Sequence, residues 1–205
     1  MFILYPLFKI KRSGVAVAGA WRLLAYFFCL GVGFIFVEIV FIQKYILFIG
    51  YPVYAVAAII FALLLAAGAG SYFSSRLSTD PIRVLRLAVF AIIVMLLFQI
   101  SVIPFLFRQF LSAPFWVRLS LSILFLLPAG FFMGMPFPIG LTVTSRIAPS
   151  FLPWAWGMNG YATVVGSVLS VILALQFGFR VVLFISGGIY LLAFLLFKTF
   201  PSRVT

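Results

Sequence analysis

The chain has almost no acidic residues and no histidine. Glu38 and Asp80 are the only two acids among 205 residues, and they stand against 14 Lys and Arg. With a single cysteine, Cys29, the chain cannot form an internal disulfide, and a metal or haem site built from Cys and His is excluded. We therefore expect no metal and no cofactor.

Sequence motifs that support catalysis are missing as well. No Gly-rich loop follows a strand, no Walker sequence is present, and no His is available to activate a Ser or Cys nucleophile. The glycines of 31–33 and 68–70 lie in apolar runs, where they favour helix packing. We expect no catalytic residue, and we predict that the chain is not an enzyme on its own.

Most residues of the chain are apolar. Hydrophobic residues make up 66% of it and charged residues 8%, and the mean hydropathy is +1.35, which is outside the range of soluble domains. A net charge of +12 would suggest nucleic acid in a soluble protein, but here Lys and Arg cluster in short loops between apolar segments. The sequence therefore predicts an integral membrane protein in contact with the lipid bilayer, with no nucleic-acid partner.

Six apolar segments are long enough to cross a bilayer as helices. They are predicted at 23–43, 52–70, 84–107, 117–138, 154–176 and 181–199. The fold is thus expected to be all-α, with a six-helix transmembrane domain at 23–199, a basic cytoplasmic or interfacial segment at 1–22 and a cytoplasmic tail at 200–205. The apolar start of the chain precedes its first basic residues and is too short to span, so it does not resemble a cleaved signal peptide.

The basic residues predict the orientation. With a cytoplasmic N-terminus, ten lie in inner segments: Lys9, Lys11, Arg12, Arg22, Arg76, Arg83, Arg86, Arg146, Lys198 and Arg203. Four lie in outer segments: Lys44, Arg108, Arg118 and Arg180. This excess places both termini in the cytoplasm of a bacterial inner membrane. The tryptophans are expected to form aromatic belts, with Trp21, Trp154 and Trp156 at the inner interface and Trp116 at the outer one.

Small residues recur every four positions in three of the predicted spans. The stripes are Ala58, Ala62, Ala66 and Gly70 in the second span, Gly130 and Gly134 in the fourth, and Ala162, Gly166, Ser170 and Ala174 in the fifth. Such stripes let helix backbones approach closely in lipid. We favour packing within the bundle, with a homodimer face as the alternative.

Glu38 is the polar residue of greatest interest, because it lies inside the apolar run GVGFIFVEIVFI of residues 31–42. A charge at bilayer depth costs about 3 kcal/mol on insertion scales, so the side chain must face protein or water. We expect it to lie against another helix, near Asn159 or Gln176. It is either a proton or cation site, an anchor for a basic residue of a partner, or a structural carboxyl that locks two helices.

The remaining polar features have simpler explanations. Gln43, Gln99, Asn159 and Gln176 are interpreted as sources of hydrogen bonds between helices. Asp80 and Pro81 are predicted to be the N-cap and first residue of the third span. Pro136 and Pro138 interrupt the fourth span, either as a transporter hinge or as the end of a helix, and we favour the helix end.

Four stretches carry a resemblance to a known family. They are GVGFIFVEIVFIQKYILFIGYPVYA (31–55), GAGSYFSSRL (68–77), GMPFPIGL (134–141) and PWAWGMNGYATVVGSVLSVILALQFGF (153–179). Together they resemble the membrane domain of bacterial spermidine synthase-like integral membrane proteins, in which a major-facilitator-like half is fused to an aminopropyltransferase domain. The resemblance covers about residues 20–200, and it implies a major-facilitator-like six-helix half with both termini inside.

The chain departs from that family in two respects. Tyr51 stands where members usually have His, and the aminopropyltransferase domain is absent, so the resemblance implies architecture and ancestry rather than activity. The start at Met1 resembles the end of a helix that follows the soluble domain in longer relatives.

Two functions remain open from the sequence. The first is a non-catalytic membrane module that acts as an anchor or accessory subunit with other membrane subunits or a cytoplasmic synthase-like protein. The alternative is a homo-oligomeric transporter half that moves a cation or polyamine, with Glu38 in the pathway. An enzyme that acts within the membrane has almost no support.

Overall fold

The structure, a computed structural model, describes residues 20–74, 76 and 80–199, which form helices joined by short turns. The predicted segment before residue 20, with Lys9, Lys11 and Arg12, and the predicted tail at 200–205 lie outside these residues. In chain order the elements are α2 (Ala20–Ile49), α3 (Pro52–Ser74), α4 (Pro81–Ser101), α5 (Ile103–Phe110), α6 (Phe115–Met133), α7 (Pro136–Ile147), the 3₁₀ turn η2 (Pro149–Phe151), α8 (Leu152–Phe177) and α9 (Phe179–Lys198).

Six helical stretches are long and apolar enough to cross a membrane, which confirms the predicted number of spans. They are Ala20–Ile49, Pro52–Ser74, Pro81–Ser101, Phe115–Ile147, Pro149–Phe177 and Phe179–Lys198. The protein is therefore an all-α, multi-pass membrane protein. The first helix is longer than predicted, and it begins at Ala20 inside the segment assigned to the N-terminal arm.

The start of α4 is as predicted. The Asp80 carboxylate accepts hydrogen bonds from the backbone N–H groups of Ile82 at 3.0 Å and Arg83 at 3.3 Å, and Pro81 occupies the first turn. Asp80 also pairs with the exposed Arg83 side chain at 3.2 Å. Asp80 thus satisfies N–H groups at the helix start that have no intrahelical partner, and its role is structural.

The fourth span is broken rather than ended, so the prediction of a helix end at the two prolines is wrong. α6 stops at Met133 and α7 begins at Pro136, and the two helices continue through one membrane span to Ile147. Pro at the first turn of a helix is tolerated because its missing N–H would have no intrahelical partner there. The prolines therefore start a second helix in the same span.

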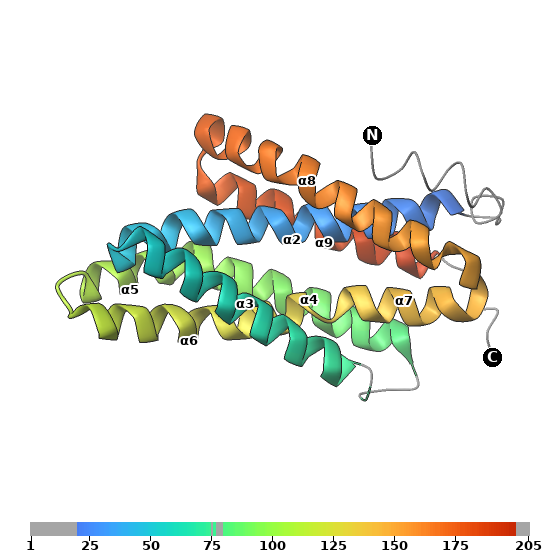
Figure 1. Cartoon of the computed structure of the whole chain (residues 1–205), viewed down its shortest axis with the longest axis horizontal. Helices are drawn as coiled ribbons and strands as arrows, with labels where there is room; N and C mark the ends of the chain where they lie inside the picture. The colour runs from blue at the N-terminus through green and yellow to red at the C-terminus, as the bar shows by residue number, and fades with distance from the viewer. Residues whose placement is uncertain (1–19, 75, 77–79, 200–205) are drawn as a thin grey trace.

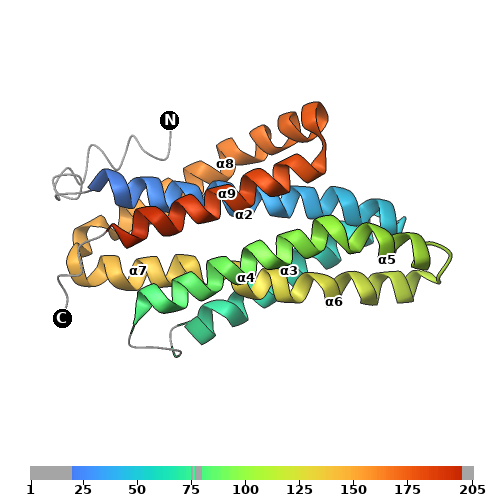
Figure 2. The ribbon, with the colours of Figure 1, turned by 180° about the vertical axis from the view of Figure 1, so that it is seen from behind.

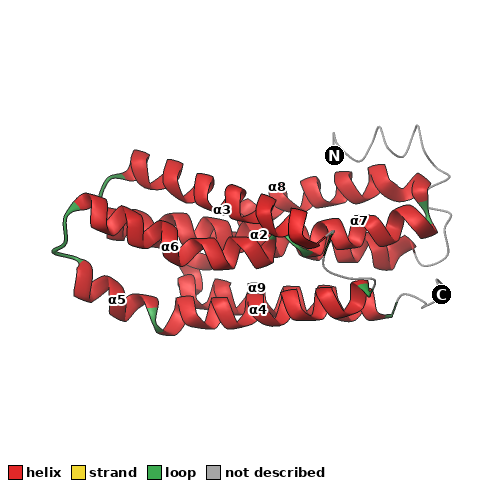
Figure 3. Cartoon of the chain, turned by 90° about the horizontal axis from the view of Figure 1, so that it is seen from below, coloured by secondary structure: helices red, strands yellow, loops and turns green. Residues whose placement is uncertain are grey.

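The helices form three layers. Figure 3 shows α3 and α8 in one outer layer, α2 and α6–α7 in the middle, and α4 and α9 in the opposite outer layer. From the front, α8 and α3 slant in the same sense across the middle layer (Figure 1), and from behind, α9 and α4 cover it (Figure 2). α2 packs most extensively against α8 and α9, whereas α3 packs against α6.

The small-residue stripes lie at these packed contacts inside the bundle. Gly70 of α3 lies directly against the Phe131 carbonyl of α6, and Gly134 lies against Ala67. A methyl group added at Gly31 of α2 would come within 2.6 Å of the Asn159 carbonyl oxygen of α8. Close backbone approach therefore joins the middle layer to the α3 and α8 layer.

The two ends of the described chain meet at one end of the bundle. The Arg22 guanidinium donates a hydrogen bond to the Thr199 carbonyl at 3.3 Å, so the start of α2 lies beside the end of α9. Trp21 and Trp156 are 62% and 61% exposed, and Trp116 is 71% exposed, as belt residues should be. Trp154 is 1% exposed, so its assignment to the aromatic belt is wrong; it is a core residue beneath the turn into α8.

Candidate functional site

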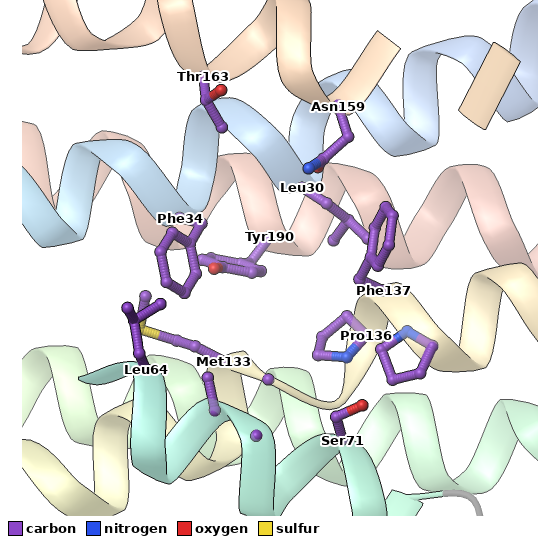
Figure 4. A pocket seen from close by; sticks show the side chains of 14 residues that line it. Leu30, Phe34, Leu64, Ser71, Met133, Pro136, Phe137, Asn159, Thr163 and Tyr190 are labelled. Carbon is purple, nitrogen blue, oxygen red and sulfur yellow. The ribbon is translucent and has the colours of Figure 1, made fainter. Parts of the chain in front are cut away.

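A cavity of about 300 Å³ lies beside the break between α6 and α7. Figure 4 shows its labelled lining residues, which come from α2, α3, the break, α8 and α9. The labelled apolar residues are Leu30, Phe34, Leu64, Met133, Pro136 and Phe137. The polar ones are Ser71, Asn159, Thr163 and Tyr190. The cavity thus brings together side chains from six helices, α2, α3, α6, α7, α8 and α9, at the break in the fourth span.

The break leaves backbone groups that no helix can satisfy. The Gly134 N–H donates to the Gly130 carbonyl at 3.0 Å and the Met135 N–H to the Phe132 carbonyl at 3.2 Å. The carbonyl of Gly134, a lining residue, would receive the N–H four residues on, but that residue is Pro138 and has none. Irregular backbone at membrane depth occurs where it is buried in protein or lines a cavity, and both conditions hold here.

Two tyrosines hold the region around the break in place. Tyr26 of α2 donates a hydrogen bond to the Pro136 carbonyl at 2.6 Å, and its ring lies directly against Gly140 of α7. Tyr190 of α9 lines the cavity and packs on Gly33, where an added methyl group would lie 3.1 Å from the ring. Its side chain is 1% exposed, and its hydroxyl has no hydrogen-bond partner among the residues that the structure describes.

Glu38 lies on α2 beside this site but outside the cavity lining. On the helical wheel it falls between Leu30 and Phe34, which line the cavity, and Gly31 and Ile35, which pack under α8. The side chain is partly buried, and its carboxylate forms no hydrogen bond or ion pair with any residue in the described part of the chain. It therefore occupies the strip of α2 between α3 and α8 without an internal partner.

The expected contact of Glu38 with Asn159 or Gln176 is not formed. Asn159 lies level with Gly31, two turns of α2 and about 10 Å before Glu38. Gln176 lies at the opposite end of α8 and is exposed. α2 and α8 run side by side in the same direction, so the contact of Ile35 with Gly166 brings Glu38 level with Ser170 instead.

Among the four amides, only Gln99 makes the predicted interhelical hydrogen bonds. Its Oε1 accepts from the Tyr45 hydroxyl at 3.0 Å and its Nε2 donates to the Phe125 carbonyl at 3.1 Å. The Lys44 ammonium donates to the Gln99 backbone carbonyl at 2.9 Å. The prediction is wrong for the side chains of Gln43, Asn159 and Gln176, which form no hydrogen bond with the described residues.

Sequence reasoning missed Tyr190 and Tyr26, which the structure places at the site. Each lies in the middle of an apolar run, where a hydroxyl needs a partner, and that was a visible signal. The partner of Tyr26 could not be identified from the sequence, because it is the Pro136 carbonyl at a break that was interpreted as a helix end.

Comparisons with protein-family models, curated proteins and solved structures find no match for this chain. The fold and the site therefore define the class by themselves. It is a six-span helical membrane protein with a broken fourth span, a cavity at the break and, beside it, a carboxyl that has no partner among the described residues. The resemblance to spermidine synthase-like membrane domains stays a prediction.

Proposed function

We propose that the protein is a non-catalytic module of the bacterial cytoplasmic membrane that serves as an anchor or accessory subunit of a larger assembly. The observation that carries this proposal is the Glu38 carboxylate, which has no partner among the described residues and lies partly buried on a membrane-spanning helix. The resemblance to the membrane part of spermidine synthase-like proteins supports the same proposal, with a cytoplasmic synthase-like protein as one candidate component.

Electrostatics defines the chemistry of the partner at Glu38. An isolated carboxylate at bilayer depth costs about 3 kcal/mol, and a basic side chain on a neighbouring helix offsets this cost. The basic residues of this chain lie near the span ends, as Lys44 and Arg118 do. Both are already engaged, since Lys44 donates to the Gln99 carbonyl and Arg118 to the Phe48 carbonyl, each at 2.9 Å. A second copy of the chain would therefore supply no matching charge, and the partner is a different membrane helix that carries Lys or Arg.

Intramembrane crosslinking tests this assignment. A photoreactive amino acid is placed at Ser167 of α8, one turn beyond the cavity-lining Thr163, and at Leu87 of α4, which is 65% exposed in the opposite layer. Irradiation of native membranes should give one heterologous protein adduct from Ser167 and only lipid adducts from Leu87. Glu38→Gln should abolish the adduct.

The matched control is Asp80→Asn, which removes the only other acid of the chain. It should leave the adduct intact, because Asp80 caps α4 at the membrane edge. Thermal unfolding of Glu38→Gln should match that of the wild type, since the carboxylate has no internal partner. Absence of any protein adduct, or an adduct that persists in Glu38→Gln, would contradict the proposal.

The second candidate is a homo-oligomeric transporter half that moves a cation or polyamine past Glu38. It is favoured by one observation, the discontinuous fourth span beside a cavity, because transporters often build their sites on broken helices near the membrane midplane. An adduct from Ser167 with the mass of a second copy, together with cation or polyamine uptake into proteoliposomes that Glu38→Gln abolishes, would establish this alternative.

A further inference from the structure

The cavity at the break is accessible from the α3 and α8 side of the bundle. Gly68 of α3 lines it, and a methyl group added there would meet no other atom within 4 Å. Its volume of about 300 Å³ is at the lower end of the range for small-molecule sites. The cavity lies between membrane-spanning helices, which favours a ligand from the bilayer.

A hydroxyl inside the cavity wall lacks a partner. The Tyr190 hydroxyl is buried and forms no hydrogen bond within the described part of the chain, and such a group costs about 1–3 kcal/mol when nothing bonds to it. By contrast, the Tyr26 hydroxyl near the break is bonded to the Pro136 carbonyl. Thr163 is also satisfied, because its hydroxyl donates to the Gly160 carbonyl at 2.8 Å. The Tyr190 hydroxyl is thus available to a ligand.

One lining residue, Gly134, also has a backbone acceptor without a helical partner. The Gly134 carbonyl cannot receive its helical hydrogen bond, because Pro138 has no N–H. A single hydroxyl group could accept a hydrogen bond from Tyr190 and donate one to Gly134, since it combines both functions in one atom. The Asn159 amide, which forms no side-chain bond with the described residues, adds a further donor and acceptor.

Of the described residues, none that lines the cavity is charged. An ammonium or carboxylate head group would therefore be desolvated without a counter-ion, which is strongly unfavourable in a membrane interior. The rest of the wall, with Leu30, Phe34 and Met133, is apolar and suits a hydrocarbon chain or ring.

We propose that this cavity binds a small uncharged amphiphile with a hydroxyl head group, taken from the bilayer. The hydroxyl bonds to Tyr190 and the Gly134 carbonyl, and the apolar part lies against Leu30, Phe34 and Met133. This site is separate from the Glu38 strip and does not depend on a partner subunit.

Photolabelling of the purified full chain with a diazirine-bearing octanol tests the proposal. Labelling should saturate and map by mass spectrometry to the cavity segments around Met133 and Asn159. Excess 1-octanol should compete, whereas octylammonium, octanoate and octane at the same free concentration should not. Equal competition by octane would show simple partition into an apolar groove and would overturn the proposal, as would the absence of saturable labelling.

Variants distinguish the hydroxyl site from general loss of structure. Tyr190→Phe removes only the oxygen and should weaken labelling about fivefold, the effect of one hydrogen bond, with a melting temperature no lower than that of the wild type, since an unpaired hydroxyl is removed. Gly68→Leu should block labelling by filling the cavity. Ala69→Leu, which adds a similar side chain on the exposed side of the same helix, should leave labelling intact. Unchanged labelling in both Tyr190→Phe and Gly68→Leu would contradict the proposal.

Discussion

The Gln99 side chain links three helices, α4, α2 and α6, by hydrogen bonds. It is 1% exposed on α4, it accepts a hydrogen bond from Tyr45 of α2, and it donates one to the Phe125 carbonyl of α6. Hydrogen bonds between membrane helices are individually modest, at about 0.6–2 kcal/mol. Two of them on one side chain, linking the middle layer to α4, make Gln99 a clear polar anchor of the fold.

Replacement of Gln99 by Leu should lower the free energy of unfolding by about 2 kcal/mol, because the Tyr45 hydroxyl and the Phe125 carbonyl lose their partner. Gln176→Leu is the matched control, since this amide is exposed and forms no side-chain bond with the described residues. Denaturant titration in detergent measures both. Equal stability of the two variants would show that the Gln99 bonds contribute nothing.

At the scale of elements, the close contact of α3 with α6 depends on glycine. Gly70 lies directly against the Phe131 carbonyl, whereas the space beside Gly68 on the same helix is open. Substitutions at Gly70 and Gly68 therefore compare a packed glycine with an unpacked one on the same helix.

Gly70→Ala should destabilise the bundle by about 2 kcal/mol, because the added methyl group forces α3 away from α6. Gly68→Ala should be neutral or slightly stabilising, since Ala is the better helix former. Thermal unfolding in mild detergent measures the difference. Equal stability of Gly70→Ala and Gly68→Ala would contradict the close approach of α3 to α6.

The six spans and the N-cap at Asp80 were predictable because both follow from local sequence. Apolar length determines a span, and an acid before Pro81 determines a cap. The broken fourth span was not predictable, because Pro136 and Pro138 suit a helix end and a helix start equally well. Only the tertiary contacts decide, through the Tyr26 bond to the Pro136 carbonyl and the packing of Gly134 on Ala67.

The site was less predictable than the spans. Glu38 could be identified from its apolar surroundings, but its place between the cavity and α8 depends on how α2 rotates against its neighbours. The same limit applies to Trp154, whose position near a span end suggested a belt residue although it is 1% exposed.

At the scale of the whole molecule, the bundle presents two different outer layers. The α3 and α8 layer opens onto the cavity and the Glu38 strip, whereas α4 and α9 cover the back (Figures 2 and 3). The hydrogen bond between Arg22 and Thr199 sets the described ends of the first and last spans on the same side of the membrane.

The excess of basic residues at that end predicts that it is cytoplasmic. Single cysteines introduced at Arg83 and Ser150 should react with an impermeant maleimide only after the cells are opened, whereas one at Leu111 should react in intact cells. The native Cys29 is buried and should give little background. Labelling of the cysteine introduced at Arg83 or at Ser150 in intact cells would overturn the predicted orientation.

The isolated chain should catalyse no aminopropyl or methyl transfer, because the sequence has neither nucleotide-binding glycine motifs nor acids for a polyamine pocket. The assay uses a decarboxylated or intact sulfonium nucleotide donor with polyamine or methyl acceptors. Turnover that survives stringent purification and co-purifies with the chain would refute the non-catalytic assignment.

The native mass of the assembly extracted in mild detergent tests the central proposal most directly. A chain of 22.8 kDa that anchors a larger complex should appear with at least one different polypeptide, and Glu38→Gln should release it as a monomer while Asp80→Asn should not. A wild-type chain that is only monomeric, or only an oligomer of itself, would contradict the account.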